Sequence, residues 1–429
     1  MSDAARERLV SGESWDDFCE TLKRAGHMLE SFGDEPNDQE RAEWYRFLSR
    51  LVRNGFERYV ENCEPESPRL QDAPWRCSIN VQNPDQDHLM CEFVNGEHEY
   101  RIVGNRGTLP YFVIAVWSSM QPEDFGGRSW ADRGVEGLAE FDPATLKTTG
   151  FLMSDEIDFD DEGNFEVIVG GRPRERNWLS LARDSTGILI RTVHHDRSKE
   201  TPPTFRIERL DDPRPRPVRA EEVSANLAKA GQMVFAYAEM MRAWWQENLS
   251  QRPNTIVFSE STYLSNGGVL DRLHGFGSWQ KPAGEALVVR FHPPPCEHWI
   301  LQLCNIWQEN LDVYEQGQGY LTKFDARYEP DGSVLAVIAD EDPGIGGNWI
   351  DSFQHEKGVF SLRLIKTEGG PPVTIHPVSL EALRSNRMVS HEQATRDLGY
   401  RPRPFRETLV DALQWFVETG RLDHSLVLC

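Results

Sequence analysis

The chain has 429 residues, which is enough for two to three domains with substantial cores. Asp and Glu total 69 against 46 Lys and Arg, giving a formal net charge of −23, so a phosphate backbone would be repelled and nucleic acid is not an expected partner. The seven cysteines are scattered and never in C-x-x-C spacing, which argues against a disulfide framework or structural zinc.

The lengths of the apolar runs and the composition of the N-terminal residues predict where in the cell the protein is located. The N-terminal residues carry charges with no apolar stretch behind them, and no run approaches the roughly 18 apolar residues of a membrane span. The sequence therefore predicts a cytoplasmic protein with no membrane partner, in which most cysteines are reduced thiols of the core.

Helical periodicity dominates the start of the chain. Apolar residues three and four apart predict a helix from about residue 14, where Ser14 and Asp17 resemble a capping box. A second stripe follows Asp38 and reaches Tyr59. We expect residues 1–75 to form an N-terminal helical segment that packs against the rest of the chain.

The apolar period then shortens to two. Strands at 99–103 and 111–117 belong to a first β module that we place at 76–212. Alternate prolines at 213–217 exclude helix interior and central strand, so 213–268 is predicted to be a Pro-rich linker followed by a long helix. A second β module is predicted at 269–380, and the remaining residues 381–429 read as a helical tail.

The two β modules repeat the same motifs. The echoed stretches are Gly163–Val169 with Gly332–Ile338, Asn177–Leu179 with Asn348–Ile350, and Gly187–Arg191 with Gly358–Arg363. The repetition predicts an internal duplication in which Asn177 aligns with Asn348 and Arg191 with Arg363. The expected fold class is α+β, mainly β, with two related antiparallel β-sandwich-like modules, an N-terminal helical segment, a linking helix and a helical tail.

Several motifs of the second module resemble those of a known family. They are His274-Gly275, Trp279, Trp299, Gln302, Asn305, Trp307, Glu309, Leu311-Asp312, Glu329–Ser333, Asn348–Ile350 and Arg363. The chain resembles, through these motifs, the bacterial family called domain of unknown function 1214. The first module is similar to the upstream part of the same proteins through Asn83-Pro84-Asp85 and Arg106-Gly107. The resemblance covers about residues 40–380 and implies β-sandwich modules, without implying an activity. The chain departs from the pattern at Ser180 and Asp351, and at His194-His195.

The tail carries a second resemblance. His391–Pro404, followed by Leu409 and Trp415, is similar to the C-terminal end of extended short-chain dehydrogenases. Those enzymes need a G-x-x-G-x-x-G phosphate turn and a Tyr-x-x-x-Lys pair, and neither motif occurs in this chain. We therefore expect the tail to be a helical appendage without dehydrogenase activity.

The strongest candidate site runs from His298 to Asp312. A buried amide without partners costs about 1–3 kcal/mol, so Gln302 and Asn305 beside aromatic residues favour a pocket. Glu309 and Asp312 are the candidate catalytic acid and base, the alternative being turn carboxylates that pair with Arg327 or Lys323.

His274 is the candidate general-base histidine, with packing on an aromatic ring as its alternative. Arg363 could anchor a substrate carboxylate or make an internal salt bridge. The predicted substrate-binding residues are aromatic, amide and basic side chains of the second module: Trp279, His298, Trp299, Gln302, Asn305, Trp307 and Arg363.

No metal or cofactor is predicted. His194 and His195 are adjacent and would point to opposite faces of a strand, so they are unsuited to binding one ion together.

Thirteen tryptophans among a few polar groups predict an apolar pocket. The expected function is a cofactor-independent acid/base enzyme, a lyase, isomerase or hydrolase, acting on a small, largely apolar molecule such as a terpenoid, steroid or aromatic compound. The alternative is a non-catalytic binding module for a sugar or lipid. Whether the chain forms a homo-oligomer is left open.

Overall fold

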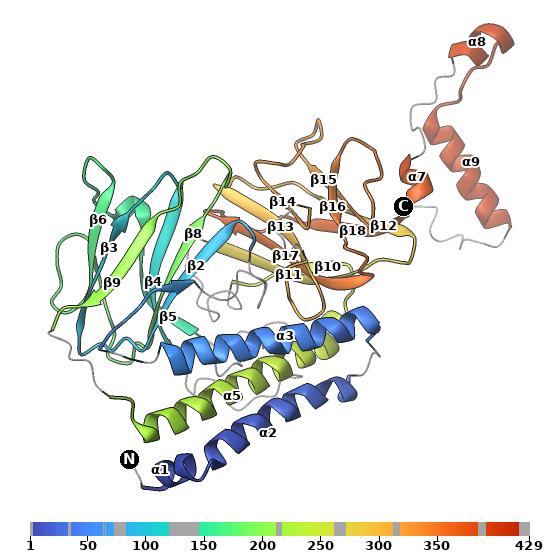
Figure 1. The fold of residues 1–429 in the computed structure, drawn as a ribbon. Helices are drawn as coiled ribbons and strands as arrows, with labels where there is room; N and C mark the ends of the chain where they lie inside the picture. Colours follow the sequence, from blue (N-terminus) through green and yellow to red (C-terminus); the bar gives the residue numbers. More distant parts are fainter. Residues whose placement is uncertain are drawn as a thin grey trace. The chain divides into compact units, whose positions relative to one another are not determined.

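The computed structural model describes residues 3–32, 36–62, 64, 66–72, 83–119, 146–211, 217–260, 272–311, 318–384 and 392–419. The chain divides into two compact units, Met1–Leu380 and Glu381–Cys429. The smaller unit holds α8 (Glu392–Leu398) and α9 (Phe405–Glu418), while the short α7 (Leu380–Arg384) begins at the last residue of the larger unit. The larger unit combines a layer of helices with two β-sandwiches (Figure 1).

The helical layer is built from two distant parts of the sequence. Its members are α1 (Asp3–Val10), α2 (Glu13–His27), the 3₁₀ turn Met28–Ser31, α3 (Asp38–Phe56) with a π-helical turn Glu57–Glu61, and α5 (Ala220–Trp244) with a π-helical turn Trp245–Leu249. α5 packs against both α2 and α3 (Figure 1). α2, α3 and α5 confirm the helix predicted from about residue 14, the helix predicted from Asp38 to Tyr59 and the long helix predicted within 213–268.

The capping prediction for α2 was wrong. α2 follows Gly12, which has no side chain to cap it, and the Ser14 hydroxyl instead lies 2.7 Å from the Ser224 hydroxyl of α5. A true capping box starts α3: the Asn37 side chain accepts from the Glu40 N–H, and the Glu40 carboxylate accepts from the Asn37 N–H, both at 2.9 Å.

The first sandwich contains a five-stranded and a four-stranded sheet. The five-stranded sheet has the order β1 (Gln71–Asp72), β2 (Gln86–Glu92), β8 (Gly187–Val193), β4 (Tyr111–Ser119) and β5 (Leu146–Met153). The 3₁₀ turn Ser154–Glu156 follows β5. The four-stranded sheet has the order β7 (Trp178–Leu179), β6 (Asn164–Gly170), β3 (Glu99–Asn105) and β9 (Thr204–Arg209), and only its β6–β7 pairing is parallel.

The second sandwich repeats this arrangement strand for strand. Its five-stranded sheet has the order β10 (Thr255–Phe258), β11 (Arg272–Gln280), β17 (Lys357–Ile365), β13 (His298–Cys304) and β14 (Tyr320–Thr322). Its four-stranded sheet has the order β16 (Asn348–Asp351), β15 (Val334–Ala339), β12 (Glu285–Phe291) and β18 (Val373–Ser379), again with one parallel pairing, β15–β16. The first strand of each sandwich, β1 or β10, precedes residues 76 and 269, where the sequence had placed the starts of the modules.

The duplication predicted from the sequence is confirmed by matching contacts. The Asn177 side chain accepts from the Asp158 N–H and donates to the Asp158 carbonyl, at 2.8 and 3.0 Å. The Asn348 side chain makes the same pair of bonds to Arg327, at 2.7 and 2.8 Å. The tryptophan after each asparagine donates its ring N–H to a carbonyl at the end of the neighbouring strand. The repeated asparagines therefore fasten the same loop in both modules.

The repeated arginines also occupy equivalent positions. Arg191 lies opposite His88 of β2, and Arg363 lies opposite His274 of β11. On the other side they lie opposite β4 and β13, respectively. The strands and their registers thus align Arg191 with Arg363, as the sequence predicted.

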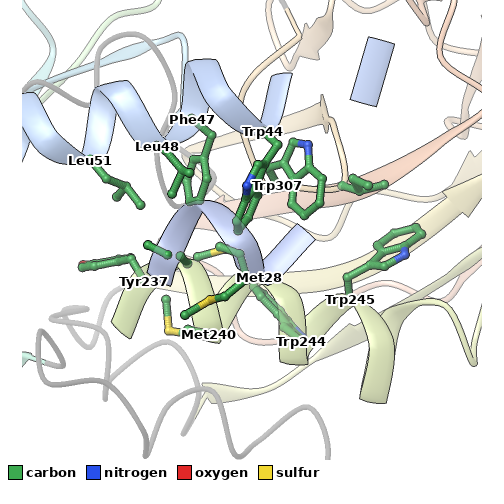
Figure 2. Close-up of a cluster of buried hydrophobic side chains, with 14 of the residues drawn as sticks. Met28, Trp44, Phe47, Leu48, Leu51, Tyr237, Met240, Trp244, Trp245 and Trp307 are labelled. Atoms are coloured by element: carbon green, nitrogen blue, oxygen red, sulfur yellow. The ribbon is translucent and has the colours of Figure 1, made fainter. Parts of the chain in front are cut away.

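A hydrophobic cluster joins the helices to the second sandwich. Trp44 and Phe47 of α3 and Trp244 of α5 pack there with Trp307 (Figure 2). Phe276 of β11 belongs to the same cluster. Burying these aromatic side chains fixes the helical layer against the outer face of the second five-stranded sheet.

The outer face of each five-stranded sheet is also turned toward the other sandwich. Tyr111, Val113 and Val193 of the first sandwich form one buried cluster with Ile365 of the second. The junction between the modules is therefore a contact between two equivalent faces. Among the described helices, none combines the length and the apolarity needed to cross a bilayer.

Candidate functional site

The residues predicted as site residues separate into three groups in the structure. Trp279 and Trp299 are completely buried in the core between the two sheets of the second sandwich. Trp307 is also completely buried, but it lies beyond the end of β13 and packs against Trp44 in a tilted arrangement with ring centroids 4.6 Å apart. These tryptophans fill cores, so the pocket expected around them is not formed by their rings.

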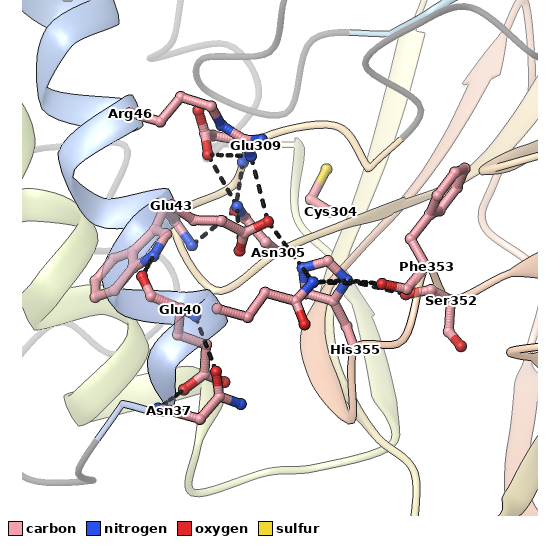
Figure 3. A network of polar contacts seen from close by, with 12 residues as sticks. Asn37, Glu40, Glu43, Arg46, Cys304, Asn305, Glu309, Ser352, Phe353 and His355 are labelled. Carbon is pink, nitrogen blue, oxygen red and sulfur yellow. Dashed lines mark hydrogen bonds and ion pairs between the residues drawn. The ribbon is translucent and has the colours of Figure 1, made fainter.

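Glu309 and Asn305 belong to a network that joins the second sandwich to α3 (Figure 3). The Asn305 amide donates to Glu43 at 3.0 Å and to Glu309 at 2.9 Å. Arg46 donates to Glu309 at 3.1 Å, and Arg50 pairs with its other oxygen. Both oxygens of this completely buried carboxylate are thus engaged by protein groups, and its basic partners belong to α3 instead of being the predicted Arg327 or Lys323.

The charges in this network are interdependent. Burial raises the pKa of the Glu309 carboxyl although Arg46 and Arg50 oppose the shift. Burial also opposes ionisation of His355, but its 3.0 Å bond to Glu43 raises the pKa of the ring above its usual value. Asp312, the predicted partner of Glu309, lies outside the described residues.

The third group lies on the outer face of the second five-stranded sheet. His274, His298, Gln302 and Arg363 come from three neighbouring strands, and their side chains share the face opposite to the core tryptophans. Arg363 donates from Nε to the His274 ring at 3.2 Å, and the ring also bonds the Ser361 hydroxyl at 2.8 Å. Since arginine can only donate, His274 must accept, which requires an uncharged ring.

The first module contributes an equivalent histidine–arginine pair to the junction between the two modules. His88 and Arg191 occupy the positions of His274 and Arg363, and Arg191 is 8% exposed. Arg272 at the start of β11 is 7% exposed and donates to Gln86 of β2, with 3.4 Å between Nη1 and Oε1. Among the described residues, both modules thus contribute arginine and histidine side chains to the junction, with Arg191, Arg363 and Arg272 all acting on His88.

Burial and the neighbouring arginines shift the pKa values of His88 and His274. Burial lowers the pKa of His88 well below its usual range, and the charges of Arg191, Arg363 and Arg272 add to the shift. Burial, then Arg363, lowers the pKa of His274 in the same way. Both rings are uncharged at neutral pH, so they supply hydrogen-bonding groups beside the guanidinium groups without adding charge.

A buried acid–histidine pair adjoins this group. His298 Nε2 lies 2.6 Å from the Asp85 carboxylate, and the two residues belong to different modules. The His298 ring stacks on Phe324, with ring centroids 5.3 Å apart. This arrangement orients the ring and places the Nε2 proton toward Asp85.

The double histidine of the first module has structural partners. His194 lies 2.9 Å from Asp87 and 3.0 Å from Glu200, and it is buried. Within the described ranges, no group of three or more His, Cys, Asp or Glu side chains could hold a metal ion.

Two grooves border the described helices. One of about 610 Å³ lies between α2 and α5, and one of about 580 Å³ lies near the start of α3. Neither is lined by a residue that the sequence had placed in the site.

Sequence reasoning missed His88, Arg272, Gln86 and the role of Asp85. The available signal was the duplication itself: once Arg191 is aligned with Arg363, the antiparallel neighbours bring two histidines into equivalent positions. Identical charged residues on otherwise apolar strands of both copies would have pointed to the junction.

One solved structure is similar to this chain over most of its length. It is the crystal structure of an uncharacterized protein from Burkholderia cenocepacia, with 30% sequence identity and a TM-score of 0.78, covering 88% of this chain and 99% of that chain. The chain belongs to the same protein family as this Burkholderia protein. The family thus shares the fold described above.

A second solved structure, the VPA0106 protein from Vibrio parahaemolyticus, has 12% identity and a TM-score of 0.42, covering 77% of this chain and 98% of that chain. No family model matches the chain, and no curated protein matches it.

Proposed function

We propose that this protein binds a small organic acid between the outer faces of its two five-stranded sheets. The observation that carries the proposal is the repeated pair: Arg191 lies opposite His88, and Arg363 lies opposite His274. Arg272 adds a third buried guanidinium group at the same junction. We also propose that the family is that of domain of unknown function 1214, whose motifs include His274 and Arg363.

The chemistry of these groups favours a carboxylate. The planar guanidinium fork matches a carboxylate with two parallel hydrogen bonds, and neutral histidines can complete the contacts without repelling the arginines further. The chain as a whole has a net charge of −23, so this local concentration of positive charge contrasts with the rest of the molecule.

The neighbouring side chains favour an apolar body for the ligand. Met90, Trp117 and Leu189 form a separate buried cluster on the same outer face of the first sheet. A molecule with one carboxylate and an apolar body would satisfy both parts of this surface. A lipid-like or aromatic acid therefore fits better than a sugar.

Acid/base catalysis on such an acid is the second candidate. The Asp85–His298 pair favours it, because a carboxylate that orients a histidine is a common arrangement for proton transfer. The low pKa of His274 makes that ring a weak base and favours a hydrogen-bonding role for it. The contacts of Glu309 support a role in joining α3 to the sandwich.

Titration calorimetry with decanoate, benzoate and inorganic phosphate tests the binding proposal. We expect at least one carboxylate to bind the wild type and Arg363→Gln to weaken it by about tenfold or more, as expected for a lost charge-assisted bond. Arg290→Gln is the matched control, because Arg290 belongs to the same module but is exposed and bonds Asp331. Unchanged affinity in Arg363→Gln, or binding of phosphate alone, would contradict the proposal.

A further inference from the structure

The Asp85–His298 pair and Asn83, two residues before Asp85, have buried polar atoms without hydrogen-bond partners. Within the described part of the chain, they include Nδ1 of His298, Oδ1 of Asp85, and both side-chain polar atoms of Asn83. His298 and Asn83 are each 1% exposed and Asp85 is 4% exposed. Buried polar groups are nearly always hydrogen-bonded in folded proteins, so these atoms point to a bound group.

The geometry of the pair fixes what His298 can offer. Nε2 is directed at the Asp85 carboxylate at 2.6 Å, so this nitrogen donates the ring's hydrogen bond to Asp85. The remaining nitrogen, Nδ1, is then an acceptor. Asp85 Oδ1 is also an acceptor, while the Asn83 amide can donate from Nδ2 and accept at Oδ1.

These atoms are connected to the arginines of the proposed acid site. Gln86 directly follows Asp85 and accepts the bond from Arg272. Arg272 and His298 lie opposite the same residue, Ile365, on the two sides of β17. The unpartnered atoms therefore lie at the end of the junction where Arg272 is located.

We propose that Asn83, Asp85 and His298 bind a hydroxyl group of the ligand, which makes the ligand a hydroxy acid. His298 Nδ1 accepts a hydrogen bond from the hydroxyl, Asn83 Nδ2 donates to its oxygen, and Asp85 orients the histidine ring. The inference rests on the proposed function, since the arginines must hold the carboxylate of the same molecule. A purely apolar ligand would leave the polar atoms of Asn83, Asp85 and His298 without partners.

Matched pairs of acids that differ by one hydroxyl group test this inference. The probes are 3-hydroxydecanoate against decanoate and mandelate against phenylacetate, titrated into the wild type, His298→Gln and Asn83→Ala. His292→Gln is the control, because His292 is an exposed histidine of the same module. Thermal unfolding of each variant shows whether it remains folded, and Asn83→Ala keeps the test valid if His298→Gln does not fold.

We expect the wild type and His292→Gln to prefer the hydroxy acid of one pair by about tenfold or more. In His298→Gln and Asn83→Ala, the ratio of the affinities for the hydroxy acid and for the acid without the hydroxyl should fall to near one. The affinity for the acid without the hydroxyl should stay unchanged. Equal affinities for both acids in the wild type, with binding still lost in Arg363→Gln, would overturn the hydroxyl assignment alone. A preference that survives in both variants would also overturn it. If no acid binds the wild type, the proposed function fails together with this inference.

Discussion

Arg272 of the second module donates a hydrogen bond to Gln86 of the first, and these two residues occupy equivalent positions in the duplicated sheets. Gln86 lies opposite Val193 in its sheet, and Arg272 lies opposite Ile365 in the other. Val193 and Ile365 are in turn members of one buried cluster. Contact between equivalent surfaces is characteristic of an approximate twofold axis, which here relates the two modules of one chain.

This relationship explains why the proposed site contains groups from both copies. Near a twofold axis, each residue of one module is brought close to its own counterpart. A single arginine–histidine pair in an ancestral module would thus become a group of two pairs after duplication. Later substitutions at equivalent positions, such as Arg272 in one module and Gln86 in the other, would make the two halves of the site different. A ligand would then bind in one orientation.

Replacing Glu309 by glutamine should reduce stability. The change removes the charge that Arg46 and Arg50 contact in a buried network, and breaking a buried ion pair costs about 3–5 kcal/mol. Urea unfolding measures the effect, with the exposed Glu329→Gln as control. Normal stability of Glu309→Gln together with a large loss of ligand turnover would instead support the catalytic role predicted from the sequence.

The His355–Glu43 pair should make stability depend on pH. The pKa of His355 is raised in the folded protein, so its contribution is complete below the unfolded value of about 6.5 and is lost as pH rises through the higher folded value. We expect the wild type to lose stability relative to His355→Gln over that range. Denaturant midpoints at a series of pH values measure this difference.

The exposed His376→Gln is the control for this experiment. It should follow the wild type at every pH. Identical pH dependence in the wild type and His355→Gln would show that the buried pair does not contribute as proposed.

The tryptophans of the second sandwich should behave as core residues. Trp299 is completely buried among Leu301, Phe360 and other apolar side chains, so Trp299→Ala should destabilise the protein by about 3–5 kcal/mol. The exposed Trp15→Ala should change stability by no more than about 0.5 kcal/mol. Weaker ligand binding by Trp299→Ala at unchanged stability would return this tryptophan to the list of ligand-binding residues.

Much of the fold could be predicted because local patterns and the repeat agree. Asn177 and Asn348 stand out in the sequence, and both fasten a loop through the same two backbone bonds. Apolar periodicity located α3 and α5 because each buries one face against the other and against the second sandwich. The capping of α2 was mispredicted because Ser14 bonds across to α5, a tertiary contact that local spacing does not reveal.

The candidate site was less predictable, because it depends on which strands become neighbours. Side chains alternate along a strand, and in 298–304 this alternation puts Trp299 on the core face and His298 and Gln302 on the outer face. It did not show that the face of His298 meets another sheet, or that β13 ends at Cys304 and leaves Asn305 and Trp307 to contact α3. Asp85 and His298 are 213 residues apart and are brought together only by the packing of the modules.

Crystals of the protein soaked with 4-bromobenzoate would test the central claim most directly, since the anomalous signal of bromine locates the ligand without ambiguity. We predict a bromine peak in the junction between the two five-stranded sheets, with the carboxylate bonded to Arg363 and at least one of Arg191 and Arg272. The peak should be absent from crystals of Arg363→Gln and present in those of Arg290→Gln. Bromine peaks found only at other places on the molecule, or a junction peak that persists in Arg363→Gln, would contradict the account.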